Sequence, residues 1–130
     1  MIHDFAKIWF EFGNNDLATA KILFKNKAYE TTILHCHQAL EKHLKGGIVA
    51  QGGEVKKTHD LPALLQATGL EFPSSLLTAI EDLNAYYQPS RYPDTAMVSS
   101  LRFDRKTAAT FLKTTEAVIK WLHYHNKPNK

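Results

Sequence analysis

The chain has 130 residues, of which 44% are hydrophobic and 22% are charged, with a formal net charge of +3. This composition predicts a single domain spanning residues 1–130, with a charge too small to indicate nucleic-acid binding by itself. The longest apolar runs are too short for a membrane-spanning helix, one cysteine cannot form an intramolecular disulfide, and the N-terminus does not resemble a signal peptide, so we expect a cytoplasmic protein.

Apolar residues at helical spacing predict a first helix over residues 3–26. The Gly-Asn-Asn sequence at 13–15 interrupts the pattern, and Asn15 is a possible cap for a second helix that starts at Asp16. We expect one continuous helix. The turn at 25–27 is so short that the next helix should be an antiparallel neighbour.

Residues 29–48 are predicted to form the central helix of the fold. Its apolar stripe consists of Tyr29, Ile33, Cys36, Leu40, Leu44 and Ile48. A polar stripe runs beside it and consists of His37, Gln38, Glu41, Lys42 and Lys45. A helix that is apolar on one side and carries so many functional groups on the next is both a core element and a candidate site.

The segment after the central helix predicts a loop and a short helix. The loop covers residues 51–57. Thr58, or alternatively Asp60, is expected to cap a third helix over residues 59–68, and Gly69 is expected to end it.

Two further helices complete the predicted fold. The fourth begins at Pro73 and Ser74 and is stopped by Pro89, and Asp104 caps the last helix. The apolar face of the fourth helix consists of Leu76, Leu77, Ile80, Leu83 and Tyr87. No stretch alternates with the period of two that marks a β-strand. The predicted fold class is therefore all-α, an up-and-down four-helix bundle with an extra short helix.

The polar stripe of the central helix has two interpretations. Glu41 with Lys45, and Gln38 with Lys42, are i, i+4 pairs, which contribute only about 0.2–0.5 kcal/mol each on a solvated face. Alternatively, the stripe lines a polar groove in which the two lysines bind phosphate while His37 or Gln38 contacts a base or ribose. The sequence leaves both interpretations open.

Two other segments carry candidate anion-binding side chains. His59 lies at a predicted helix start, where it either caps and packs or flanks an anion site formed by free N–H groups. Arg91 and Tyr92 follow a pair of tyrosines. An arginine beside aromatic rings suits phosphate binding with base stacking, whereas an ion pair between Arg91 and Asp94 is the alternative.

Metal, cofactor and nucleophile chemistry are not favoured by the residue pattern. The two H-x-H pairs, at 35–37 and 123–125, place their imidazoles about 200° apart around a helix, so neither pair can share one ion. Cys36 lies on the apolar stripe, where a thiol is usually an inert small hydrophobe. We therefore expect no metal and no cofactor.

Four motifs in series resemble the HEPN domain family (higher eukaryotes and prokaryotes nucleotide-binding). The first helix carries Trp9 and D-L-x-x-A at 16–20, and the second carries H-Q-A-L-E-K-x-L-K at 37–45. T-H-D-L at 58–61 opens the third helix, and R-Y-P-D at 91–94 follows the fourth. Their order and spacing cover nearly the whole chain, and the series is more specific than any single motif.

The resemblance implies a helical bundle that usually dimerises, binds nucleotide or RNA, and in many members cleaves RNA. RNA-cleaving members carry an arginine followed after four to six residues by a histidine, but the residues at 96–98, which follow Arg91 at that spacing, are Ala, Met and Val. The RNase activity is therefore not carried over by the resemblance. The binding face that it implies consists of His37, Gln38, Glu41, Lys42, Lys45, His59, Arg91 and Tyr92.

We therefore expect a non-catalytic or weakly catalytic nucleotide- or RNA-phosphate-binding domain. Lys42, Lys45 and Arg91 would bind phosphate, and the glutamate of the polar stripe would orient the lysines. Tyr92 would stack on a base, while Gln38 would make polar contacts. The resemblance implies a homodimer or a minimal nucleotidyltransferase partner in a toxin–antitoxin-like pair.

Two rival functions belong to other classes. One is an RNase with a rearranged site in which His37 or His59 replaces the missing histidine. The other is a purely protein-binding module whose polar stripe is an interface. Neither rival involves a membrane.

Overall fold

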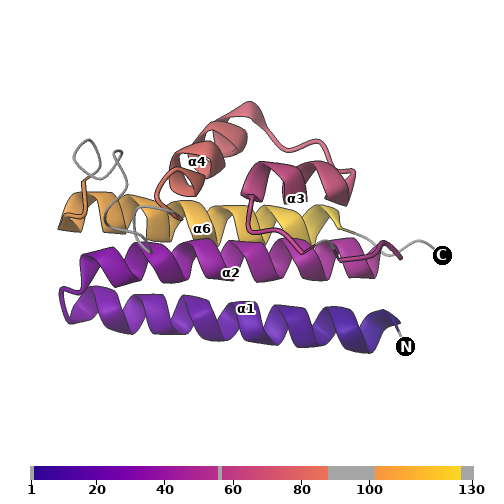
Figure 1. Cartoon of the computed structure of the whole chain (residues 1–130), viewed down its shortest axis with the longest axis horizontal. Helices are drawn as coiled ribbons and strands as arrows, with labels where there is room; N and C mark the ends of the chain where they lie inside the picture. The colour runs from indigo at the N-terminus through magenta and orange to yellow at the C-terminus, as the bar shows by residue number, and fades with distance from the viewer. Residues whose placement is uncertain (1, 56, 88–101, 127–130) are drawn as a thin grey trace.

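The computed structural model describes residues 2–55, 57–87 and 102–126, and within them the fold is entirely helical (Figure 1). The helices are α1 (Ile2–Lys25), α2 (Tyr29–Ala50), α3 (Leu61–Thr68), α4 (Ser74–Asn84) and α6 (Arg105–His125). None of these helices is long and apolar enough to cross a membrane.

The helix α2 lies in the middle of the bundle and contacts α1, α3, α4 and α6. In Figure 1, α1 lies on one side of α2, while α3, α4 and α6 lie on the other side. The helices α1, α2, α4 and α6 alternate in direction along the chain, and α3 is the additional short helix. The predicted up-and-down bundle with a central second helix is confirmed.

The apolar stripe of α2 supplies the middle of the hydrophobic core. Five of its six predicted members are buried: Ile33, Cys36, Leu40, Leu44 and Ile48. Side chains from every other helix pack on this stripe, among them Ala20, Leu64, Leu83 and Leu122. Burying such side chains contributes roughly 1.5–3 kcal/mol each, which is why the apolar period predicts the packing of this helix well.

The helix α1 is continuous across Gly13, as predicted. The glycine at this position allows α1 to approach α2 closely. A Cβ atom at Gly13 would lie 2.5 Å from the Cδ2 atom of His43. The His43 ring is buried, with its Nε2 atom 3.0 Å from the Oδ1 atom of Asn14 and its Nδ1 atom 2.9 Å from the Nε2 atom of His123. The glycine therefore provides room for a buried imidazole between α1, α2 and α6.

Replacement of Gly13 by alanine is expected to lower the free energy of unfolding by about 1–3 kcal/mol because the added methyl group overlaps the His43 ring. We expect this net loss of stability even though alanine normally stabilises a helix by about 1 kcal/mol relative to glycine. Urea unfolding measures the change. The exposed Asn15 provides the control, since Asn15→Ala should leave stability unchanged or raise it. Equal effects of the two substitutions would contradict the close-approach explanation.

The start of α3 differs from the preferred prediction. Asp60, and not Thr58, is the N-cap: its Oδ2 atom accepts a hydrogen bond from the N–H of Ala63 at 3.1 Å, and the helix begins at Leu61. The Thr58 hydroxyl instead accepts from the N–H of Asp60 at 3.1 Å. Gly69 ends the helix as predicted, with a left-handed φ of 72°.

The start of α6 is as predicted, and the α4 prediction was right at the beginning of the helix and for the inward Ile80 and Leu83. Asp104 accepts a hydrogen bond from the N–H of Thr107 at 2.9 Å, and this bond lowers the pKa of Asp104. The helix α4 begins at Ser74 but ends at Asn84, and Leu77, expected on its apolar face, is exposed. Pro89, the expected stop signal, lies outside the described residues.

Candidate functional site

The polar stripe of α2 is only partly accessible. His37, Glu41 and Lys45 are buried, while Gln38 and Lys42 are half-buried. The interpretation of the stripe as a solvated face is therefore wrong for the three buried residues, which are covered by other helices of the same chain.

Glu41 is the centre of the buried charges on α2. Its Oε2 atom accepts from the Nζ atom of Lys45 at 2.9 Å, and its Oε1 atom accepts from the Nδ1 atom of His59 at 2.9 Å. The Lys45 side chain is only 8% exposed, and its ammonium group lies 5.6 Å from the ring centroid of Trp9. Glu41 therefore holds one buried cation and orients the imidazole of a loop residue.

Lys42 is neutralised on the opposite side of the stripe. Its ammonium group donates to the Oδ2 atom of Asp16 in α1, whose Oδ1 atom lies 3.2 Å from the Nδ1 atom of His35. The predicted i, i+4 partner of Lys42 was Gln38. Asp16 was recognised only as part of the motif in α1, and its role as an ionic partner depends on how α1 packs against α2.

The side-chain amide of Asn84 holds His37 in place. The Oδ1 atom of Asn84 accepts from the N–H of Leu61 at 3.0 Å, and its Nδ2 atom donates to the Oδ1 atom of Asp60 at 3.0 Å. These two bonds fix the orientation of the amide, so the Nε2 atom of His37, 3.1 Å from the same Oδ1 atom, must carry a hydrogen and donate. Asn84 thus links α2, α3 and α4.

The other ring nitrogen of His37 is unusual among the described residues. The Nδ1 atom is buried without a hydrogen-bond partner and lies 4.0 Å from the Oε1 atom of Glu41. Burial lowers the pKa of His37 to about 4, so its imidazole is neutral near pH 7. His37 is therefore a structural residue behind the site.

A small pocket opens beside this network. Its volume is about 200 Å³, and it is lined by Gln38, Glu41, Lys42, His59 and Tyr87. The His59 side chain is 59% exposed, and its ring stacks on Tyr87 with centroids 5.3 Å apart. The pocket therefore combines an accessible imidazole, an ammonium group, an amide and an aromatic ring.

Six of the eight predicted site residues come together around this pocket. They are His37, Gln38, Glu41, Lys42, Lys45 and His59. Arg91 and Tyr92 lie outside the described residues. The sequence-based set missed Tyr87, Asn84 and Asp16, although Tyr87 belongs to the tyrosine pair that precedes the R-Y-P-D motif.

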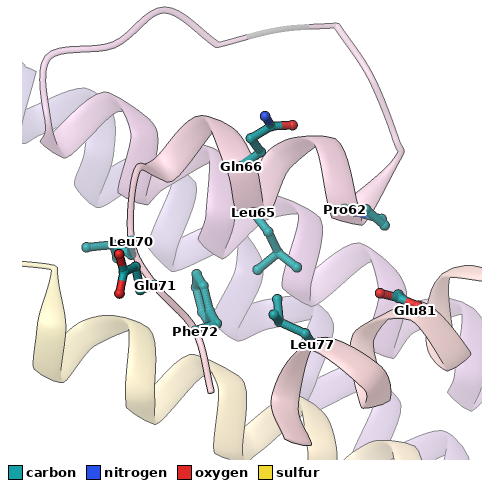
Figure 2. A pocket seen from close by; sticks show the side chains of 8 residues that line it. All are labelled: Pro62, Leu65, Gln66, Leu70, Glu71, Phe72, Leu77 and Glu81. Carbon is teal, nitrogen blue, oxygen red and sulfur yellow. The ribbon is translucent and has the colours of Figure 1, made fainter. Parts of the chain in front are cut away.

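A larger hollow lies between α3 and α4 and has different chemistry (Figure 2). Its volume is about 370 Å³, and its walls include Leu65, Phe72 and Leu77. The charged residues that line it, Glu71 and Glu81, are both acidic. This hollow is therefore unsuited to a phosphate group.

The described residues offer no alternative metal or thiol chemistry at this site. No group of three or more His, Cys, Asp or Glu side chains in the described ranges is arranged to hold a metal ion. Cys36 is buried, and burial raises the pKa of its thiol to about 12. The thiol is therefore protonated and inert, as its position on the apolar stripe predicted.

The fold and the site together define a class of protein. It is an all-helical bundle whose second helix carries histidine, lysine and glutamate side chains at the site. The HEPN domain family matches over residues 6–126, and the chain belongs to this family.

Two solved structures share the fold. The crystal structure of TT1696 from Thermus thermophilus has a TM-score of 0.79 and 26% sequence identity, covering 92% of this chain and 96% of that one. ST0689, described as an archaeal HEPN homologue, has a TM-score of 0.76 and 25% identity, covering 94% of this chain and 98% of that one. No functionally curated protein matches the chain.

Proposed function

We propose that the chain is a nucleotide- or RNA-phosphate-binding HEPN domain without RNase activity, and that its ligand binds in the pocket beside His59. The observation that carries this proposal is an accessible imidazole held by a buried carboxylate, since Glu41 accepts from His59 at 2.9 Å. His59 and Lys42 would donate to phosphate oxygens. Tyr87, whose ring contacts the rings of His37 and His59, would flank the bound ligand, and Gln38 would supply a directional amide.

Lys45 has a positioning role in this proposal because its ammonium group is enclosed by Glu41 and Trp9. Glu41 and Asp16 already balance the charges of Lys45 and Lys42, so an anionic ligand requires further positive charge. Arg91 would supply it. Arg91 lies four positions after Tyr87 in the sequence, and four steps along the chain span at most about 14 Å. Tyr92 would then extend the stacking surface.

The rearranged RNase is the second candidate, and one contact favours it. The pairing of His59 with Glu41 has the geometry of a general base oriented by a carboxylate. His37 does not suit this role, because it is buried and donates to Asn84. In this candidate, His59→Ala would abolish cleavage of RNA by the purified protein, whereas in the binding proposal the unaltered protein cleaves none.

The partners that we propose follow from family membership. They are a minimal nucleotidyltransferase, in a toxin–antitoxin-like pair, and a second copy of the chain in a homodimer. The rival protein-binding module shares these partners but has no nucleotide ligand. Nucleotide binding therefore separates it from the leading proposal.

The deciding experiment is a calorimetric titration with ATP, GTP and a short RNA at two salt concentrations. We expect binding that weakens with salt. Substitutions His59→Ala, Lys42→Ala and Arg91→Ala should each weaken it about 10- to 100-fold, since a hydrogen bond to a charged group contributes about 1.5–3 kcal/mol.

The matched control is Lys113→Ala, which removes an exposed lysine of α6 that does not line this pocket. Lys45→Ala is not a suitable test, because it would leave Glu41 buried without its cation. Binding that survives both His59→Ala and Lys42→Ala would refute this location of the site. No binding of any of the three ligands would favour the protein-binding module.

A further inference from the structure

The hollow between α3 and α4 has an apolar wall that is open to solvent (Figure 2). Leu65 of α3, Phe72 of the following loop and Leu77 of α4 lie together in its middle. Leu77 is 36% exposed although the apolar period of α4 predicts burial, and its side chain points into the hollow. The volume of about 370 Å³ falls within the range of small-molecule pockets. The hollow is therefore a candidate ligand site with a mainly apolar wall.

The segment that forms the hollow is acidic. Residues 61–84, which include α3, α4 and the loop between them, carry Glu71, Glu81 and Asp82 but no lysine, arginine or histidine. The whole chain, in contrast, has a net charge of +3. This local reversal of charge attracts cations to the hollow and repels phosphate groups.

The two carboxylates that line the hollow, those of Glu71 and Glu81, are free to bind a cation. Both side chains are exposed, and neither has a hydrogen bond or an ion pair with another residue of the described ranges. Glu41, which lines the pocket beside His59, is instead already paired with Lys45. The hollow therefore presents two uncompensated negative charges next to an apolar wall.

The arrangement of these groups selects the shape of the ligand. Figure 2 shows Glu71 and Glu81 at opposite ends of the hollow, with Leu65, Phe72 and Leu77 between them. A divalent metal ion does not fit, because it requires several oxygen ligands around one point. A matching ligand has an ammonium group at each end and an apolar chain between. The volume equals that of about twelve liquid water molecules, which corresponds to a chain of about ten non-hydrogen atoms.

We propose that this hollow binds a linear aliphatic polyamine. Its terminal ammonium groups pair with Glu71 and Glu81, and its methylene chain lies on the apolar wall between them. The contact of methylene groups with apolar side chains adds affinity that an inorganic cation cannot gain. The site is separate from the pocket beside His59 and does not depend on nucleotide binding.

The first test is a calorimetric titration of the unaltered chain with spermidine, without nucleotide and at two salt concentrations. We expect binding that weakens with salt, because the carboxylates are exposed. Glu71→Gln and Glu81→Gln should each weaken it about two- to five-fold, as ion pairs at exposed carboxylates do. The matched control is Asp82→Asn, which removes the same charge from an exposed residue of α4 that does not line the hollow. It should change the affinity less than about two-fold.

The second test separates a polyamine site from a general attraction of cations. Cadaverine carries an ammonium group at each end of its chain, and it should bind several-fold more tightly than pentylamine, which has the same chain length but one ammonium group. Leu77→Asn should weaken the binding of both amines, because it removes part of the apolar wall. Mg²⁺ should displace spermidine far less readily than cadaverine does, since it gains nothing from that wall.

Three results would overturn the proposal. The first is an unaltered chain that binds neither spermidine nor cadaverine. The second is an equal loss of affinity in Asp82→Asn and Glu81→Gln, and the third is displacement of spermidine by Mg²⁺ as readily as by cadaverine. The last two results would show that cations are only attracted to an acidic surface.

Failure of this proposal is distinguishable from failure of the nucleotide-binding proposal, because the hollow and the pocket beside His59 share no lining residue. His59→Ala should bind spermidine as the unaltered chain does, and the double variant Glu71→Gln with Glu81→Gln should bind ATP and GTP as the unaltered chain does. A chain that binds spermidine but no nucleotide would support the polyamine site and refute only the nucleotide site. A chain that binds nucleotide but no polyamine would refute only the polyamine site.

Discussion

Replacement of Glu41 by alanine is expected to lower the free energy of unfolding by about 3–5 kcal/mol, because it leaves the ammonium group of Lys45 buried without its partner. The hydrogen bond that ties His59 to α2 is lost in the same variant. Urea unfolding followed by circular dichroism measures the change. Glu41→Gln should be less harmful, because its amide oxygen can still accept from Lys45.

The chain contains a matched control for this experiment. Lys7 and Glu11 form an ion pair of the same i, i+4 spacing on α1, with both side chains exposed and a separation of 4.0 Å. Truncation of Glu11 should therefore cost less than about 1 kcal/mol. Similar costs at the two positions would show that burial does not govern the Glu41 pair.

The second large effect is loss of stability in acid. Burial lowers the pKa of His37 to about 4, and burial together with the neighbouring His123 lowers the pKa of His43 to about 4, from an ordinary value of 6.5. Between these values the unfolded chain binds protons that the folded chain does not, so stability should fall as the pH decreases from about 6.5 to about 4. Each imidazole contributes about 3 kcal/mol to this loss.

Unfolding free energies measured at several pH values across this window test the expectation. His37→Gln and His43→Gln should each reduce the dependence on pH by about one proton, because each removes one group whose titration differs between the folded and unfolded states. His125→Gln, which changes an exposed histidine, serves as the control. A stability that stays constant from pH 7 to about 4.5 would contradict the burial of neutral histidines.

Most of the fold was predictable because the packing of a helical bundle follows from the spacing of apolar residues. The stripe from Ile33 to Ile48 identifies the inward face of α2 without knowledge of its neighbours. Asp104 was recognised as a cap because its partner is only three residues away. The cap of α3 was less certain, because Thr58 and Asp60 are both good capping residues and only the tertiary contact between Asn84 and Asp60 distinguishes them.

The candidate site was predictable as a set of residues on one helix but not as a network. Helical spacing places Glu41 beside Lys45, and this pair is observed. The partner of Lys42 depends on the side-by-side packing of α1 and α2, which brings Asp16 to it. Asn84 carries no sequence signal at all, since an asparagine at the end of an amphipathic helix usually has no distant partner.

The Asn84 amide has a consequence for the motions of the molecule. One side chain holds the end of α4, the first turn of α3 and the ring of His37 together. Loss of these bonds would leave α3 and α4 held to α2 by their buried apolar side chains alone, and would make opening of this part of the bundle easier. We therefore expect the α3–α4 segment to behave as a separate cooperative unit in amide hydrogen exchange. A ligand beside His59 would then slow its exchange by opposing this local opening.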